Sequence, residues 1–557
     1  MNFEPTADQA MIAETFARFL DEHSSIARVR AALPGGFDPE LWRSFAEMGG
    51  FGIRAPEAAG GLGLGLFDAV LVMDEVGRTL ASGPIPEAIV AAGLLGRYGE
   101  GETLPRLLAG HAVVSLAFHD IAKSPRQWVA GGAVAEAVVA RRGCEVVLVR
   151  IASPSGEANL ASTPLAEIDL AALDYTVLAS GDDAVAAFAA AIEEWKLLVA
   201  AALAGLSHEA LRLAAAYAGE RKQFGQFIGT FQAISHPLAD LLCKADGARY
   251  LVWKALRDIA DGSDEAGATV SLALWWAADA AARTGTQALH TFGGYGLTTE
   301  YDIHLCNLRA KDWPLVLGDP QRLLAEAGRR LYAGERVALP DVGEVPIDFN
   351  LGGEAAAIVS EIDALFAAHV TPEMRAQFHY SWEGYVPAVH KMLAANGVAF
   401  PGLSAELTGR QIGGYARNAV REALDRQGYL TPAAGVAGMV ALMIAKFGSD
   451  EIKRDVLPQI LNGEVICSLG YFEPGSGSDV FAAQCKATPE GNGWRIDGTK
   501  MFTSGANLST YVLMLCRTNT EVAKHKGLTM FIVPLKADGV TIQPVYTFQD
   551  ERTNITF

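Results

Sequence analysis

The sequence predicts a multi-domain α+β fold in which a complete first copy of one unit is followed by a second, incomplete copy. Three observations predict it: a length of 557 residues, an order of helices, strands and helices, and a restart of that order near residue 350. A chain of this length exceeds a single hydrophobic core and suggests about three or four domains. Because the order of elements recurs, we interpret the chain as an internal duplication.

The composition limits the class of protein. Half of the residues are hydrophobic and 20% are charged, as in globular chains. The net charge of −19 argues against a nucleic-acid partner, because binding phosphates needs a basic surface. The six cysteines form no C-x-x-C pair, no basic and apolar leader opens the chain, and the longest apolar run, 197–206, is about half a membrane span. We therefore expect a cytoplasmic protein without a metal site or a membrane span.

The first copy has three parts. Residues 1–110 have helical periodicity and form an expected N-terminal helical domain. Residues 111–185 contain short β-type runs such as CEVVLVRI, broken by Pro, Gly and Ser, and form an expected degenerate middle β-domain. Residues 186–335 return to long alanine-rich helices. The stretch 336–350 has two prolines and no periodicity, so we interpret it as a linker.

The second copy repeats only part of this order. Residues 351–465 are helical in pattern, as in VSEIDALFAAHV, and predict a second N-terminal helical domain. Residues 466–557 contain strand-like runs such as TYVLMLC and LTMFIVPL, and predict a second β-domain. The pattern stops at Phe557 while still in strands, so we expect this β-domain to be truncated.

One segment recurs at a constant offset of 353 residues. LPRLLAGHAVVSLAFHD at 104–120 matches LPQILNGEVICSLGYFE at 457–473. After the match the copies differ: the second continues as EPGSGSD at 473–479, whereas the first has DIAKSPR at 120–126. A proline, small Gly and Ser positions and an aspartate predict an irregular loop with free backbone N–H groups. The two copies are therefore not expected to do the same work.

These motifs together resemble the acyl-CoA dehydrogenase family of flavoenzymes. The resemblance rests on APEAAGG at 55–61, on EPGSGSD, and on R-x-x-F-G at 221–225 followed by F-Q-A-I-x-H and by F-G-G-x-G at 292–296. It covers nearly the whole chain, and the agreement of several spaced elements makes it specific. The resemblance implies an N-terminal helical domain, a middle β-domain and a C-terminal four-helix bundle. It also implies FAD bound between the β-domain of one subunit and the bundle of its neighbour.

In the second copy the resemblance implies residues that contact the flavin and the substrate. They are Leu469, Tyr471, Phe472, Gly477 and Ser478 in the loop, and Phe502 and Ser504 in KMFTSG. Small residues let the backbone approach a ligand closely enough to donate hydrogen bonds. Phe472 departs from the Thr or Ser usual in the family and removes a hydroxyl from the flavin. Phe502 has an alternative role as an ordinary core residue of a strand.

In the first copy the resemblance implies contacts to the ADP part of FAD. Arg221 and Phe224 match bundle residues that the family presents to the FAD of the neighbouring subunit, and an arginine offers a diphosphate a planar cationic fork. His290 stands where the family has Gln, just before Gly293 and Gly294. The alternatives are a solvated surface charge for Arg221 and a structural role for His290.

The family's catalytic base is missing from the first copy. The family places a glutamate at either of two bundle positions, and this chain has Leu317 and Trp195 there. Glu194 is adjacent, but a neighbour on a helix points about 100° away, so we expect it to be solvated. We therefore expect no catalytic residue in the first copy and a base beyond Phe557.

The resemblance implies a flavin-dependent acyl-CoA dehydrogenase. Its cofactor would be FAD, its reaction the α,β-desaturation of an acyl-CoA thioester, and its acceptor an electron-transfer flavoprotein. A homo-oligomer is expected, and the duplicated layout is similar to bacterial enzymes of sterol side-chain breakdown. We expect the two copies to form a pseudo-dimer with one FAD. The alternatives are a flavin-dependent oxidase of the same fold and a catalytically dead binding or scaffold homologue.

Overall fold

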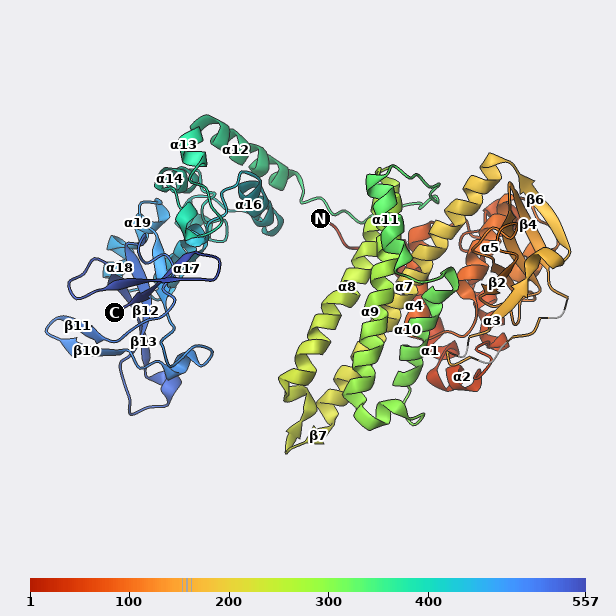
Figure 1. The fold of residues 1–557 in the computed structure, drawn as a ribbon, viewed down its shortest axis with the longest axis horizontal. Helices are drawn as coiled ribbons and strands as arrows, with labels where there is room; N and C mark the ends of the chain where they lie inside the picture. The colour runs from red at the N-terminus through yellow and green to blue at the C-terminus, as the bar shows by residue number, and fades with distance from the viewer. Residues whose placement is uncertain (153, 157–158, 162) are drawn as a thin grey trace. The chain divides into compact units, whose positions relative to one another are not determined.

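The computed structural model describes residues 1–152, 154–156, 159–161 and 163–557 (Figure 1). The chain forms two compact units, which we call the first unit (Asn2–Phe349) and the second unit (Asn350–Phe557). Each unit starts with helices and continues into a sheet, and only the first goes on to a bundle of long helices. The predicted fold class, with a second and partial copy, is thereby confirmed.

The first unit begins with helices that bury aromatic and aliphatic side chains in one core. The first helix starts at a capping box, in which Thr6 and Gln9 satisfy each other's backbone N–H groups, and it buries Phe16, Phe19 and Leu20. The helices are α1 (Ala7–His23), α2 (Ile26–Ala31), α3 (Pro39–Glu47), α4 (Leu66–Arg78), α5 (Ile85–Arg97) and α6 (Thr103–Leu108).

A small sheet follows these helices. Its strand order is β1-β3-β4-β6, with β1 parallel to β3 and the other pairs antiparallel, and β2 pairs with β5 beside it. The strands are β1 (Val114–Leu116), β2 (Arg126–Val129), β3 (Ala137–Arg142), β4 (Glu145–Arg150), β5 (Ala166–Asp169) and β6 (Tyr175–Ser180). The buried strands β3 and β4 are rich in valine, a residue that packs well on a pleated sheet.

Long helices complete the first unit. Figure 1 shows α7, α8 and α9 running alongside one another, and α7 also packs against α4 and α5. The elements are α7 (Asp182–Glu220), a hairpin of β7 (Lys222–Gln223) and β8 (Gln226–Phe227), α8 (Gln232–Ala260), α9 (Ala266–Phe292), α10 (Ile303–Asp312) and α11 (Arg322–Tyr332). Helix α7 begins before the expected start of the bundle at 186. No helix in the described part of the chain is long and apolar enough to cross a membrane.

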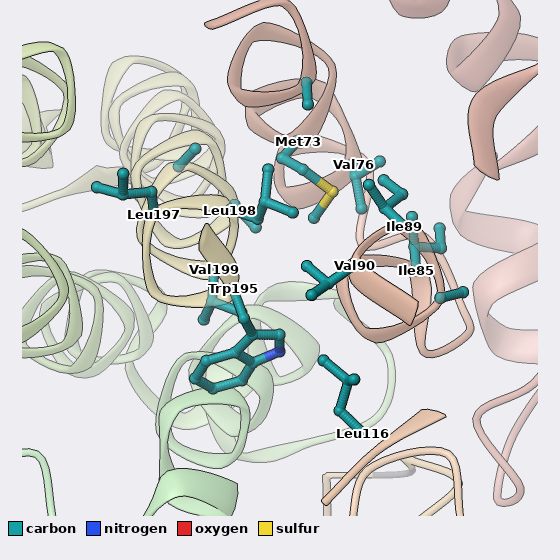
Figure 2. Close-up of a cluster of buried hydrophobic side chains, with 14 of the residues drawn as sticks. Met73, Val76, Ile85, Ile89, Val90, Leu116, Trp195, Leu197, Leu198 and Val199 are labelled. Atoms are coloured by element: carbon teal, nitrogen blue, oxygen red, sulfur yellow. The ribbon is translucent and has the colours of Figure 1, made fainter. Parts of the chain in front are cut away.

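The middle of α7 is buried on all sides because other helices surround it. Figure 2 shows Trp195, Leu198 and Val199 of α7 in one cluster of buried side chains with Met73 of α4 and Val90 of α5. A helix that is apolar all round is typical of such a central position.

The segment expected to be a linker packs against the first unit. It has almost no regular secondary structure, as predicted, but Val342, Val345 and Ile347 are buried in the unit's core. The N–H of Leu66 also donates to the carbonyl oxygen of Val342 at 3.0 Å. Most of 336–350 therefore packs on the first unit, and the unit boundary falls at its end, between Phe349 and Asn350. Its role as a linker between the two copies stays a prediction.

The second unit repeats the helical part of the first. Its helices are α12 (Gly353–His369), α13 (Pro372–Arg375), α14 (Pro387–Ala395), α15 (Ala405–Thr408), α16 (Gly414–Arg426), α17 (Pro432–Phe447), α18 (Asp450–Asp455) and α19 (Leu457–Leu461). The repeat is visible at Gly110 and Gly463, each with φ of +70°. A Cβ at Gly110 would lie 2.9 Å from the Cβ of Ala46, and a Cβ at Gly463 would lie 2.9 Å from that of Ala394. Both positions need glycine for the same close helix contact.

The sheet of the second unit keeps the same core of three strands. Strand β9 is parallel to β12 and β12 is antiparallel to β13, as β1, β3 and β4 are arranged in the first unit. The strands are β9 (Cys467–Gly470), β10 (Lys486–Glu490), β11 (Gly493–Asp497), β12 (Tyr511–Arg517), β13 (Leu528–Pro534), β14 (Ile542–Tyr546) and β15 (Arg552–Thr556). The loop EPGSGSD therefore leaves the sheet directly after β9.

Candidate functional site

The loop after β9 is anchored by a buried ion pair. The Lys500 ammonium lies 2.8 Å from Oε1 of Glu473, and both side chains are almost fully buried. The Glu473 carboxylate also accepts the N–H groups of Gln484 at 2.6 Å and Cys485 at 2.9 Å, while Lys500 Nζ donates to the carbonyl oxygen of Tyr471. Burial alone would raise the pKa of Glu473, but Lys500 and the two N–H groups hold it below its ordinary value. One carboxylate thus fixes both ends of the loop.

The structure brings the loop and the segment KMFTSG side by side. The N–H of Met501 donates to the carbonyl oxygen of Phe472 at 2.9 Å. The side chains of Phe472 and Phe502 are 43% and 58% exposed, and Phe502 has a φ of +54°, a left-handed conformation uncommon for an aromatic residue. An exposed aromatic ring on a constrained backbone is available for a planar ligand rather than for the core, which disfavours the alternative of Phe502 as a core residue.

Two residues that are distant along the chain, Thr553 and Trp382, contact the segment KMFTSG. The Ser504 and Thr553 hydroxyls lie 2.9 Å apart. Gly505, with φ of +74°, lies so close to the Trp382 ring that a Cβ would come within 2.1 Å of it. Glycine is required there because the indole occupies the space of a side chain. No sequence motif pointed to Trp382 or Thr553, since both are distant from KMFTSG along the chain.

The remaining predicted residues of the second unit are in two environments. Leu469 and Tyr471 are half-buried and pack against the hydrophobic core of that unit. Gly477 and Ser478 are exposed, and no atom lies within 4 Å of a Cβ built on Gly477. The backbone at the tip of the loop is therefore uncovered, whereas the residues just before the loop pack on the core.

The donor groups of this loop fit a flavin. Ser476 is buried, and its hydroxyl has no hydrogen-bond partner among the described residues. A buried hydroxyl without a partner is costly and is usually satisfied by water or a ligand. The Ser476 hydroxyl and the backbone N–H of Gly477 are donors of the kind that the polar atoms of an isoalloxazine ring need, and the exposed rings of Phe472 and Phe502 offer apolar faces for its plane. Ser476 was missed by the sequence analysis.

A second group of predicted residues meets at the far end of α7 in the first unit. Arg221, Gly293 and Gly294 line a cavity of about 510 Å³. Arg221 follows the last residue of α7, and its guanidinium makes no ion pair with any described residue. No atom lies within 4 Å of a Cβ built on either glycine. A free guanidinium beside an accessible backbone suits an anionic ligand such as a diphosphate.

Phe224 and His290 do not line this cavity. Phe224 stands at the tip of the β7–β8 hairpin, 92% exposed, with its ring edge-on to Phe231. His290 is exposed in the last turn of α9. The cavity instead contains Tyr217, whose ring stacks on Phe292 with 4.2 Å between centroids. Sequence reasoning missed Tyr217 because it lies on a helix face that the motif R-x-x-F-G does not include.

Protein-family models of three domains match most of the chain. The acyl-CoA dehydrogenase N-terminal domain matches residues 6–112 and again 353–464, the C-terminal domain matches 185–331, and the middle domain matches 468–552. The chain is 29% identical over 530 residues to acyl-CoA dehydrogenase FadE34 of Mycobacterium tuberculosis, covering 91% of this chain and 70% of that protein. It is 30% identical over 329 residues to acyl-CoA dehydrogenase IpdE2 of Mycolicibacterium smegmatis, covering 58% of this chain and 98% of that protein.

The chain belongs to the acyl-CoA dehydrogenase family. Its fold is similar to that of a solved variant of the Tcur3481-Tcur3483 steroid ACAD, with a TM-score of 0.53 and 25% identity, covering 59% of this chain and 98% of that one. The resemblance found in the motifs is thus confirmed, and membership of the family implies a flavin-dependent oxidoreductase. Among the described residues, no group of three His, Cys, Asp or Glu side chains is placed to hold a metal ion.

Trp195 and Leu317, which the motif resemblance places at the two base positions, carry no proton acceptor on their side chains. Trp195 is fully buried, with its ring 4.4 Å from that of Phe118, and its Nε1–H donates to Oε1 of Glu87 at 2.8 Å. Leu317 is half-buried at the end of a 3-10 helix, Trp313–Leu317. Burial raises the pKa of Glu87 to about 7. The indole and the carboxyl group satisfy each other inside the core.

Glu194 differs from its expected state. It is 8% exposed and forms a two-pronged ion pair with Arg54, at 3.0 and 3.3 Å. The expectation of a solvated Glu194 is therefore wrong, because Arg54 covers this side of α7. Its carboxylate is engaged by an arginine rather than free to accept a proton.

The first unit has no counterpart of the EPGSGSD loop. In its shorter segment after β1, backbone N–H groups are already paired within the protein. The Asp120 carboxylate accepts the N–H groups of Ala122 and Gly143. The Gln127 side chain bonds both the N–H and the carbonyl oxygen of His119. Because these groups are already paired within the protein, this segment leaves fewer of them open to a ligand than the loop after β9 does.

Proposed function

We propose that the protein is a flavin-dependent acyl-CoA dehydrogenase that introduces an α,β double bond into an acyl-CoA thioester. The observation that carries the proposal is the pairing of the loop after β9 with KMFTSG, joined by the hydrogen bond from Met501 to Phe472 and fixed by Glu473 and Lys500. When bound, FAD supplies the acceptor for the hydride that leaves Cβ of the thioester.

The residues of the second unit would hold the ring system. Phe502 offers an exposed aromatic face, and the hydroxyls of Ser476, Ser478 and Ser504 offer hydrogen bonds to its polar atoms. Phe472 replaces the family's hydroxyl with an aromatic ring, so we propose that Ser476 supplies part of the missing hydrogen bonding. Family resemblance and chemical type support these assignments.

The end of the first unit's bundle would hold the nucleotide part of FAD. Arg221 has a free guanidinium, and Gly293 and Gly294 leave their backbone open to a diphosphate. We propose that Phe224 and His290 approach the cofactor only when a partner surface covers the exposed hairpin. The two sets of residues do not duplicate each other, since one suits a flavin ring and the other suits a diphosphate.

The carboxylate that takes the α-proton would not come from the first unit. Trp195 and Leu317 occupy its two positions, and Glu194 is engaged by Arg54. We propose that the base belongs to a different helical bundle that serves the flavin loop of the second unit. Removing the α-proton of a thioester needs a carboxylate that is poorly solvated and close to Cα.

The substrate class and the acceptor rest on relatives. A solved relative is a steroid ACAD, which supports a bulky thioester such as a sterol side chain as the substrate of this protein. We propose an electron-transfer flavoprotein as the acceptor and a homo-oligomer as the assembly, both from family resemblance.

One experiment separates this proposal from its alternatives. FAD-loaded protein is mixed anaerobically with acyl-CoA thioesters, and bleaching of the flavin absorbance is expected. Hydrogen peroxide formed on admitting oxygen at the rate of turnover would favour the oxidase. Failure to bind FAD at all would contradict the proposal and favour the binding or scaffold homologue, which Leu317 and Trp195 already suggest.

A further inference from the structure

The first unit contains another cavity, remote from the cavity that Arg221 lines in the same unit. Its volume is about 490 Å³, and it lies where the segment after β1, the N-terminal half of α7, the 3-10 helix Trp313–Leu317 and α11 meet. Ile192 of α7 lines it, and at 1.5 Å per residue the helix places Arg221 roughly 40 Å away. This volume is within the usual range of small-molecule pockets.

The walls of the cavity are mainly apolar. They are formed by Phe118, Phe188, Ile192, Leu317 and Leu323. Apolar walls in a concave site favour a ligand with a hydrocarbon or aromatic body, since its burial removes apolar surface from water.

The polar floor of the cavity is fully engaged in internal contacts. Lys196 Nζ lies 2.8 Å from Glu193 and 2.5 Å from Glu326, and Arg330 pairs with the same two carboxylates. Ser271 donates a further hydrogen bond to Glu326 at 2.8 Å. Because each charge has an opposite partner, this network shapes the floor and leaves no carboxylate free to take a proton from a ligand.

The rim carries one arginine that lacks a partner. The guanidinium of Arg322, at the start of α11, makes no ion pair within the described ranges, whereas Arg329 on the same helix is held by Glu335 at 2.7 Å. His119 also lines the rim, and burial together with the nearby Arg322 charge lowers its pKa, so it stays neutral at pH 7. The rim therefore presents a free cation beside a neutral hydrogen-bonding ring.

We propose that this cavity binds an amphiphilic carboxylate, with its apolar body against Phe118, Phe188 and Leu323 and its carboxylate on Arg322. The ligand is held without reaction, because Leu317 faces the cavity where the family would have a base and the floor charges are paired. The first unit thus has a binding role of its own, separate from the redox site of the proposed function.

The test is calorimetric titration of the chain with decanoate, and with decanol as the neutral analogue. Decanoate is expected to bind and decanol to bind at least about tenfold more weakly, since a hydrogen bond to a charged group is worth about 1.5–3 kcal/mol. Arg322→Gln should weaken decanoate binding by about tenfold or more. Arg329→Gln, the matched change at a paired arginine of the same rim, should leave it within about twofold. Decanoyl-CoA is titrated in the same way. If it binds with the same affinity as decanoate and loses the same affinity in Arg322→Gln, the bound group is the carbonyl end and not a free carboxylate. That result would overturn the carboxylate assignment.

A filling variant gives an independent outcome. Ile192→Trp should abolish decanoate binding while FAD binding, measured separately, is unchanged. Equal losses in Arg322→Gln and Arg329→Gln, no decanoate binding to the natural chain, or undiminished binding to a folded Ile192→Trp protein would each overturn the proposal. If Ile192→Trp does not fold, the comparison of the two arginine variants decides.

Discussion

Trp195 and Glu87 form a buried hydrogen bond, Nε1 to Oε1 at 2.8 Å. No cation pairs with this carboxyl group among the described residues, and burial raises its pKa to about 7. The indole also packs on Phe118. The motif resemblance predicts a family base position at Trp195, and the structure has core packing there.

Glu87→Gln is expected to change how stability depends on pH. The folded-state pKa of about 7 lies above the ordinary value of 4.5, so the folded chain binds the proton more tightly than the unfolded chain. The contribution of Glu87 to stability is fully present below about pH 4.5 and is lost as pH rises to about 7. Glutamine keeps an acceptor for Trp195 without the charge, so the variant should exceed the natural protein by up to about 3 kcal/mol at pH 8 and match it near pH 4.5.

Urea unfolding at several pH values checks this prediction. Glu47→Gln, an exposed glutamate on α3, serves as the control and should leave the pH profile unchanged. A Glu87→Gln protein with the same pH profile as the natural one would show that Glu87 is ionised in the fold.

His390→Phe tests a buried histidine in the second unit. His390 is fully buried, neither ring nitrogen has a partner among the described residues, and burial lowers its pKa to about 4. As pH falls, this histidine is protonated in the unfolded chain before it is protonated in the folded chain. Its contribution to the free energy of unfolding is therefore fully present above about pH 6.5 and is lost as pH drops towards 4. The variant, which keeps the edge contacts to Tyr385 and Phe400, should gain about 2 kcal/mol at pH 5. Thermal unfolding at pH 5 and pH 8 measures it, and a loss of stability at both would refute the neutral assignment.

Lys500→Met is expected to loosen the flavin loop. It leaves the Glu473 carboxylate buried without its cation, which typically costs about 3–5 kcal/mol. Hydrogen exchange of residues 471–505 should accelerate, and the double variant Lys500→Met, Glu473→Gln should recover part of the loss because no buried charge remains. Lys536→Met, at an exposed lysine of the same unit, is the control. Unchanged exchange in Lys500→Met would mean that the ion pair does not fix the loop.

Arg221→Gln is expected to weaken FAD binding by about tenfold or more. The guanidinium has no partner to lose among the described residues, so its removal should not alter folding, whereas a charged hydrogen bond to a diphosphate is worth about 1.5–3 kcal/mol. Arg283→Gln is the matched control, since that bundle arginine is exposed and paired with Asp279 at 2.8 Å. Fluorescence titration with FAD measures both, and equal affinity of the two variants would remove Arg221 from the proposed site.

The sequence predicted what depends on local patterns and failed where contacts are long-range. The duplication could be predicted because Gly110 and Gly463 stand at the same place in the repeated segment. Both have a positive φ that favours glycine. The ion pair between Glu473 and Lys500 could not be predicted, since two charged residues 27 positions apart form no periodic pattern. The burial of Glu194 was misjudged for a related reason: a 100° turn correctly separated it from Trp195, but the sequence does not reveal that Arg54 covers that face.

We propose that the two copies are unequal and that only the second offers the contacts a flavin ring needs. The stoichiometry of FAD tests this most directly, measured by titrating the chain and determining the bound flavin after gel filtration. We expect one FAD per chain, and we expect Gly477→Val to abolish its binding. Two FAD per chain, or binding that survives in Gly477→Val, would contradict the proposal.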